Sequence, residues 1–101
     1  MDISIAGFGT VVAIVTLATE AYVELFCRGT VAPDELRRIL SGIPDVVDAG
    51  TVTGSADAIV HMRSRDIPSL EVALERVRVA PNVDHTRSAI VLSRLIHRAH
   101  D

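Results

Sequence analysis

Apolar and polar positions follow one another along the chain with either strand or helix spacing. Strands are expected over residues 10–17 and 20–28, because β-branched and aromatic residues are concentrated in both segments. A helix is expected to begin at Pro33, since proline suits the first turn, and to end at Gly42 and Pro44. Its apolar residues recur every three or four positions and form one stripe, which consists of Leu36, Ile39, Leu40 and Ile43.

The second half of the chain repeats this order. Segments 45–53 and 57–64 have strand character, and the link between them is so short that they form an antiparallel hairpin. Asp66 can cap a second helix. The expected inner face of that helix consists of Ile67, Leu70, Ala73, Leu74 and Val77. A last strand is expected over 84–95.

An internal echo indicates a duplicated fold. The segment Pro44-Asp45-Val46-Val47-Asp48 is echoed by Pro81-Asn82-Val83-Asp84-His85. In each copy a helix with an apolar stripe leads through proline and valine into a strand. Two such units joined by a hairpin make βαββαβ, the ferredoxin-like α+β arrangement, with both helices on one face of the sheet.

The other face of this sheet is expected to be covered by another subunit. Residues 11–15 and 89–92 are apolar at consecutive positions, and strands that are apolar on both sides imply burial on both sides. The chain has 101 residues, of which 49% are hydrophobic, and its mean hydropathy of +0.35 is high for one small domain. We therefore predict an obligate dimer or a higher oligomer built from dimers.

Composition and motif spacing argue against several classes of function. The formal net charge of -3 argues against a nucleic-acid binder held by phosphate contacts. One cysteine, Cys27, excludes an internal disulfide, and the four histidines match no metal-ligand spacing. No nucleophile-elbow or phosphate-loop motif is present, so no enzyme activity, metal or cofactor is expected. The uncharged stretch 3–19 suits neither a membrane helix nor a signal peptide, so a cytoplasmic protein without a membrane partner is expected.

The predicted hairpin turn is where the residues offer most chemistry. The sequence Val52-Thr53-Gly54-Ser55-Ala56-Asp57 places a glycine, hydroxyl groups and a carboxylate at one tight turn. Gly54 permits a positive φ and a close backbone approach. Free amides beside Asp57 could hold the carboxylate and the ammonium of a small zwitterion. A plain turn in which Asp57 bonds to local amides explains the same residues, and the residues alone favour it.

Five motifs stand in register between Glu20 and Leu95. They are Pro44-Asp45-Val46, Val52-Thr53-Gly54-x-x-Asp57, Arg65-Asp66, Pro81-Asn82-Val83 and Thr86-Arg87-Ser88. Together they resemble the effector-binding domain, or RAM domain, of the Lrp/AsnC family of transcription regulators. The resemblance implies a ferredoxin-like domain of the dimeric α/β-barrel type over 20–101, preceded by a linker and hinge strand over 1–19.

The resemblance also implies a function and its residues. It implies homodimers that pack sheet to sheet, assembly into tetramers or octamers, and a small effector, typically an amino acid, held between subunits. By position, the effector would be bound by Thr53, Gly54, Ser55 and Asp57. The residues Thr86, Arg87 and Ser88 would be structural or interfacial. DNA would be bound only through a separate helix-turn-helix domain, which is expected to be absent from this chain.

Two other functions stay open. Ser55 and Ala56 stand where family members often carry an acidic residue and an aromatic one, so a ligand-free oligomerisation module is an alternative. A small dimeric α+β-barrel enzyme would share the fold. It would need a deep pocket between helices and sheet, and this chain has few aromatic side chains to line one: Phe8, Tyr22 and Phe26.

Overall fold

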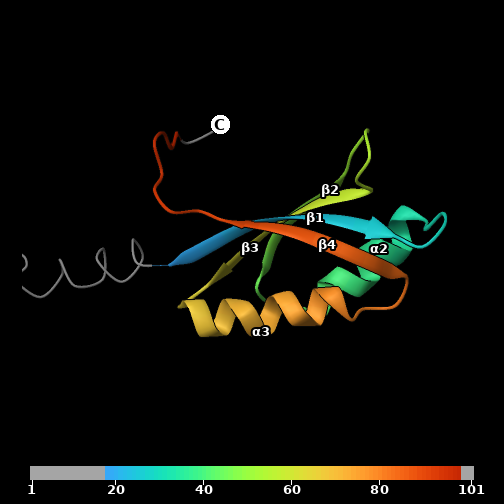
Figure 1. Ribbon diagram of the computed structural model, residues 1–101, viewed down its shortest axis with the longest axis horizontal. Coiled ribbons are helices and arrows are strands. Elements are labelled where there is room, and N and C mark those ends of the chain that lie inside the picture. Colours follow the sequence, from blue (N-terminus) through green and yellow to red (C-terminus); the bar gives the residue numbers. More distant parts are fainter. Residues whose placement is uncertain (1–17, 99–101) are drawn as a thin grey trace, which may run out of the picture.

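Six elements follow one another in the computed structural model, which describes residues 18–98 (Figure 1). They are β1 (Thr19–Cys27), α2 (Pro33–Ser41), β2 (Val46–Thr51), β3 (Ala58–Ser64), α3 (Ile67–Arg78) and β4 (Val83–Ile90). This βαββαβ order confirms the predicted ferredoxin-like α+β fold. The strand expected over 10–17 lies outside the described residues, and the division into 1–19 and 20–101 stays a prediction.

The four strands form one antiparallel sheet in the order β2-β3-β1-β4, with β3 and β1 at its centre. On the central strands Val23 lies opposite Val60, and on the edge strand β4 it lies opposite Ser88. The predicted hairpin is confirmed as the antiparallel pair β2 and β3. The C-terminal end of β1 lies beside the beginning of β3, since Leu25 pairs with Ala58. The turn between β2 and β3 is therefore next to the end of β1.

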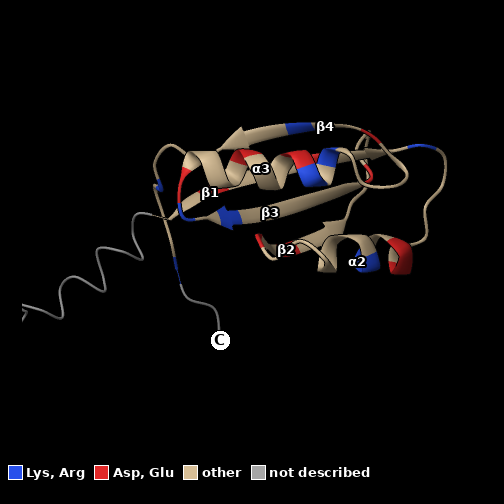
Figure 2. Ribbon diagram, turned by 90° about the horizontal axis from the view of Figure 1, so that it is seen from below, with Lys and Arg blue, Asp and Glu red and all other residues tan. Residues whose placement is uncertain are grey.

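The two helices begin and end where local signals place them. Pro33 stands in the first turn of α2, and the N–H of Gly42 donates to the Ile39 carbonyl at 3.3 Å where the helix ends. The Asp66 carboxylate accepts a hydrogen bond from the Ser69 N–H at 2.8 Å, which caps α3. The outer surfaces of both helices carry charged residues, and both helices lie on one side of the sheet (Figure 2).

The core fills the layer between the sheet and these helices. Its members are apolar and almost fully inaccessible to solvent, and they include Ala21, Val23, Leu25, Val60, Met62, Leu36, Leu40, Leu70, Ala73 and Val77. Of the stripe predicted for α2, Leu36, Leu40 and Ile43 belong to the core, whereas Ile39 is only half-buried and lies outside it. One residue predicted for the inner face of α3 is not there: Ile67 is 43% exposed, because it occupies the first position of the helix, a turn ahead of Leu70.

The last strand is shorter than predicted. It ends at Ile90 and not at Leu95, and residues 91–98 have no regular structure. The reason is that, among the strands of residues 18–98, β4 is at the edge and pairs with β1 alone, and Ile90 already lies opposite Ala21 near the beginning of β1. The chain then rises from the side of the sheet that faces away from α3 (Figure 1).

The expectation that the strands are apolar on both sides is wrong for the described strands. Strands β1 and β3 alternate cleanly, and the run 89–92 falls largely beyond the end of β4. The side of the sheet away from the helices is named the open face, and the pairing register shows which residues lie on it. It carries Glu20, Tyr22, Glu24 and Phe26 from β1, Ile59, His61 and Arg63 from β3, and His85 and Arg87 from β4.

Candidate functional site

The turn between β2 and β3 is the first candidate site. The N–H of Val52 donates to the Asp57 carbonyl at 3.2 Å and closes the turn. Gly54 has φ +110°, a backbone conformation that favours glycine, and a Cβ built there would meet nothing within 4 Å. Thr53, Gly54 and Ser55 are all exposed. The predicted positive φ is confirmed, and the space around the turn is open.

The backbone of this turn presents unused donors. Within residues 18–98, the amide groups of residues 53–56 make no hydrogen bond to a protein acceptor. Successive free N–H groups in a turn form a concave patch of positive potential that attracts anions. Thr53, Gly54 and Ser55 are exposed with free N–H groups, whereas Ala56 is 7% exposed, so the first three are the donors open to a ligand.

Asp57 ties the turn to the end of the central strand β1. Its carboxylate accepts a hydrogen bond from the Cys27 N–H at 2.8 Å, and its own N–H donates to the Leu25 carbonyl at 2.9 Å. A plain turn was expected to use local amides, but this partner is 30 positions away in the sequence. Burial raises the pKa of the Cys27 thiol, and the negative charge of Asp57 raises it further, so this thiol stays protonated at neutral pH.

The second predicted group lies on β4. The register places Thr86 opposite Leu25, and Leu25 lies opposite Ala58 on its other side, so Thr86 is at the same end of the sheet as the turn. Strands are spaced at about 4.8 Å, so β3 and β4 are about 10 Å apart across β1. Within one chain, the turn residues and the β4 motif do not form a single pocket.

Arg87 points the other way from its neighbours on β4. It lies on the open face, where its guanidinium pairs with Glu24 at 3.1 Å and stands 5.9 Å from the centre of the Phe26 ring. Ser88, opposite Val23, belongs to the side facing the helices. Of these three adjacent residues, Thr86 and Ser88 therefore lie on the side facing the helices, and Arg87 lies on the open face.

A polar cluster around Glu20 on the open face was not predicted. The Glu20 carboxylate contacts the His61 ring nitrogen at 2.6 Å and the Arg94 guanidinium at 2.7 Å, with Arg63 at 3.9 Å. Burial alone would raise the pKa of Glu20, but hydrogen bonds from Arg94 and His61 and the nearby guanidinium charges hold it below its ordinary value. The alternation Glu20-x-Tyr22-x-Glu24 is the sequence signal that could have revealed this cluster.

Stacked rings complete the open face. Tyr22 stacks on His61 with ring centres 4.6 Å apart, and Phe26 stacks on His85 with ring centres 4.3 Å apart. Each pair joins neighbouring strands. The open face is thus a mixture of flat rings and paired charges, a composition typical of protein interfaces more than of a hydrophobic core.

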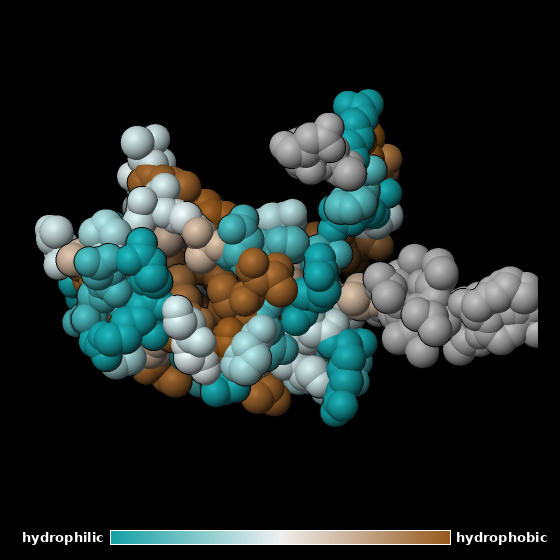
Figure 3. All heavy atoms as spheres, turned by 180° about the vertical axis from the view of Figure 1, so that it is seen from behind, coloured by the Kyte–Doolittle hydropathy of each residue, from teal (hydrophilic) through white to brown (hydrophobic). Residues whose placement is uncertain are grey.

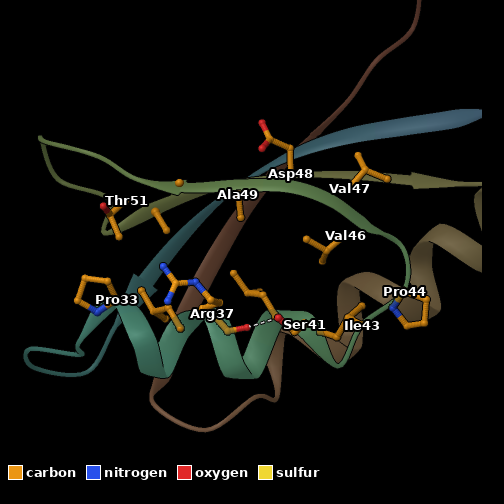
Figure 4. A pocket seen from close by; sticks show the side chains of 14 residues that line it. Pro33, Arg37, Ser41, Ile43, Pro44, Val46, Val47, Asp48, Ala49 and Thr51 are labelled. Carbon is orange, nitrogen blue, oxygen red and sulfur yellow. Dashed lines mark hydrogen bonds between the residues drawn. The ribbon is translucent and has the colours of Figure 1, made fainter.

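A cavity of about 410 Å³ lies between α2 and β2 (Figure 4). Val46 and Ala49 point into it from β2, whereas Val47 and Asp48 point away. Arg37 reaches up from α2 along its wall, but its guanidinium is already paired with Asp34 at 2.5 Å. The cavity is therefore chiefly apolar, and no sequence motif indicated it.

Neither a cluster of metal-binding side chains nor a membrane-spanning helix occurs in the part of the chain that the structure describes. Between residues 18 and 98, no three or more His, Cys, Asp or Glu side chains lie close enough together to hold a metal ion. Neither α2 nor α3 has the length and apolar character that crossing a bilayer requires.

Comparison with known proteins identifies the class to which this fold and turn belong. Residues 20–100 match the family described as the Lrp/AsnC ligand binding domain, and the chain belongs to this family. The resemblance based on the five motifs is confirmed.

Individual relatives agree with this assignment. The HTH-type transcriptional regulator Rv2324 of Mycobacterium tuberculosis is 51% identical over 96 residues, which are 93% of this chain and 65% of the relative. The feast or famine regulatory protein Rv3291c from M. tuberculosis, in a structure complexed with L-methionine, is 27% identical with a TM-score of 0.69; the match covers 91% of this chain and 60% of that protein. This chain thus spans less than two thirds of both.

A further relative is an enzyme. Homocitrate synthase of Sulfurisphaera tokodaii is 28% identical over 76 residues, which are 75% of this chain but only 16% of the enzyme. The similarity therefore concerns a small part of that enzyme.

Proposed function

We propose that this chain is the ligand-sensing and oligomerisation domain of an Lrp/AsnC-type transcription regulator, and that it binds a small amino acid between subunits at the turn Thr53–Asp57. The observation that carries the proposal is the row of unused amide groups at residues 53–56 beside the Asp57 carboxylate. This arrangement offers donors for a carboxylate and an acceptor for an ammonium group within one turn.

The parts of the effector can be assigned by charge. Its carboxylate accepts hydrogen bonds from the free amides, and the hydroxyl groups of Thr53 and Ser55 add donors beside them. Its ammonium approaches Asp57, where one carboxylate oxygen is held by Cys27 and the other has room for a second partner. The turn is exposed and has no second wall, which is why the binding site is placed between subunits. The L-methionine named with a related structure supports an amino acid as the effector.

The open face is the proposed dimer surface. Its central strand β1 carries the acids Glu20 and Glu24, and the strands on either side carry Arg63 and Arg87. When two such faces pack with their strands crossing, acids of one copy can meet bases of the other. Homodimers of this kind assemble into tetramers or octamers in the cytoplasm, and DNA is bound through a separate helix-turn-helix domain.

Effector binding would regulate the protein by shifting this assembly. A ligand held between subunits favours the assembly state to which it binds more tightly. The free energy of assembly shifts by the difference between the binding free energies of the ligand in the two states. No catalytic step is part of this function.

Calorimetric titration with a panel of L-amino acids tests the site. Asp57→Asn keeps an oxygen that can accept from the Cys27 N–H but removes the charge, and it is expected to weaken binding about 10- to 100-fold, the cost of a charge-assisted hydrogen bond. Glu71→Gln, the same loss of charge at an exposed acid on α3, on the other side of the sheet, is the matched control and should bind like the natural sequence. Light scattering on the same samples gives the oligomeric state.

Two results would contradict the proposal. If no amino acid binds at millimolar concentration although the protein is oligomeric, the chain is a ligand-free oligomerisation module. If amino acids bind equally well to the natural sequence and to Asp57→Asn, the effector site is elsewhere.

A further inference from the structure

The segment that follows β4 exposes apolar side chains to an unusual degree. Residues 91–98, called the C-terminal arm below, have no regular structure. Leu92 is 95% exposed, Leu95 is 91% exposed and Ile96 is 67% exposed. Neighbouring large apolar side chains left in water on one short segment mark a surface that packs against another molecule.

The arm is anchored to the sheet at its beginning. The N–H of Val91 donates to the Glu20 carbonyl at 2.8 Å, and the guanidinium of Arg94 pairs with the Glu20 carboxylate at 2.7 Å. Glu20 belongs to the open face, so these contacts fix the side of the sheet on which the arm departs. In the space-filling view the arm stands clear of the body of the domain, with hydrophobic and hydrophilic groups along it (Figure 3).

We propose that the C-terminal arm packs Leu92, Leu95 and Ile96 against a second copy of this chain across the open face, and so acts as a clasp between two subunits. The proposal rests on the proposed sheet-to-sheet dimer and adds a reciprocal contact that each subunit makes with its partner. By two-fold symmetry, one dimer has two such clasps.

The position of the arm suits this partner. The arm and the β2–β3 hairpin both project from the side of the sheet opposite α3, so they flank the open face on two sides (Figure 1). The sheet of a second subunit that packs on this open face therefore contacts the arm of the first subunit. The partner's open face also offers an apolar surface to receive the arm, formed by the partner's copies of Tyr22, Phe26 and Ile59.

The length of the arm is sufficient. Residues 95–98, which follow the Arg94 anchor, span about 13 Å when extended at about 3.3 Å per residue, and packed sheets are about 10 Å apart. These residues can therefore cross the gap between two sheets while Val91 and Arg94 stay bound to Glu20.

The arm carries two arginines, Arg94 and Arg98. Arg94 lies between Leu92 and Leu95 and is paired with Glu20, so its positive charge is neutralised on its own subunit. Arg98 is exposed and follows Ile96 by two positions, so it can stay in water at the rim while the apolar side chains face the partner.

Sedimentation velocity over a dilution series tests the clasp. Leu92→Ala, Leu95→Ala and Ile96→Ala combined should raise the dimer dissociation constant about tenfold or more, because three exposed anchors are removed. The matched control combines Val72→Ala and Val79→Ala, which removes comparably exposed apolar groups from α3 and from the residue that follows it, and should leave the constant unchanged. Far-ultraviolet circular dichroism verifies that both variants are folded.

A spin label separates a contact between chains from one within a chain. The label is placed at Leu95→Cys in a Cys27→Ala background, and the labelled chain is mixed with ¹⁵N-labelled chains that carry no spin label. A label at Val91→Cys, at the anchored beginning of the arm, gives the broadening that the sheet-to-sheet dimer alone produces. Broadening of the amide signals of Tyr22 and Ile59 in the ¹⁵N-labelled chains should be stronger with the label at Leu95→Cys if the arm reaches the partner.

The outcomes separate this proposal from the one on which it rests. If the natural sequence dimerises and the triple variant dimerises equally well, the clasp is wrong and the sheet-to-sheet dimer stands. If the ¹⁵N-labelled chains show no more broadening with the label at Leu95→Cys than with the label at Val91→Cys, the arm does not reach the partner and the clasp is wrong. If the natural sequence is monomeric throughout the dilution series, both proposals are wrong.

Discussion

The two faces of the sheet use the same strands for different purposes. On β3, Val60 and Met62 are fully buried against the helices, whereas His61 between them faces outward and contacts Glu20. The covered face is almost entirely apolar, and the open face combines stacked rings with paired charges. Strand alternation thus divides one sequence into a side that stabilises the domain and a side that is suited to recognise a partner.

The largest effect is expected on the covered face. Met62→Ala removes a fully buried side chain and leaves a cavity, so the free energy of unfolding should fall by about 2–5 kcal/mol. His61→Ala, at the next position of the same strand, should cost about 1 kcal/mol, because it removes one hydrogen bond and one stacking contact. Urea denaturation at one fixed protein concentration measures both. Equal losses would show that the two faces contribute equally to the fold.

A smaller effect is expected from the centre of the open face. Glu20→Gln keeps the length of a side chain that is 14% exposed but removes the charge that His61 and Arg94 contact. The free energy of unfolding at pH 7 should fall by about 1–2 kcal/mol. Glu24→Gln is a more exposed control on the same strand and should cost less. A gain in stability on Glu20→Gln would contradict the contacts described for this carboxylate.

The effect of Glu20 should depend on pH in one direction. Its pKa in the folded protein lies below the ordinary value of 4.5, so the ionised form is favoured by folding. The stabilisation is complete above the ordinary value and is lost as the pH falls through the lowered pKa of the folded protein. The difference in unfolding free energy between the natural sequence and Glu20→Gln should therefore shrink on acidification. A difference that stays constant from pH 7 to pH 3, titrated by urea denaturation, would contradict the pKa direction.

The smallest effect is expected outside both faces. Val72 lies on the outer surface of α3 and is 63% exposed, so Val72→Ala should change the unfolding free energy by less than about 0.5 kcal/mol. The same urea series measures it. A loss of unfolding free energy comparable to that of Met62→Ala would mean that this surface of α3 is covered in solution. The assignment of Val72 to the exposed surface would then be wrong.

The elements that could be predicted from the sequence are those with local causes. Asp66 caps the backbone three residues ahead, Pro33 opens its helix, and Gly54 takes the positive φ of its turn. The apolar stripes of both helices and the echo around Pro44 and Pro81 then defined the order of elements. Apart from the echo, which compares two segments 37 positions apart, each of these signals lies within a few residues, and for that reason it could be recognised along the chain.

The features that were missed depend on strand neighbours. The end of β4 is set by where β1 begins, and the partner of Asp57 is an amide that only the sheet brings near. Likewise, the cavity beside α2 depends on how closely that helix approaches the edge strand β2. The turn was singled out from its own residues, and the effector-binding role predicted for it came from the family resemblance. Its free amides became visible only once the pairing of the hairpin was known.

The bond between Asp57 and the Cys27 amide gives the exposed turn a mechanical link to the interior. Cys27 is the last residue of a central strand, and the next N–H, that of Arg28, donates to the Asn82 carbonyl just before β4 begins. A molecule that draws the Asp57 carboxylate outward therefore pulls on the junction of two strands at once. Because these two consecutive amides bond to the turn and to the segment before β4, a ligand that displaced Asp57 would also disturb the packing of both strand ends.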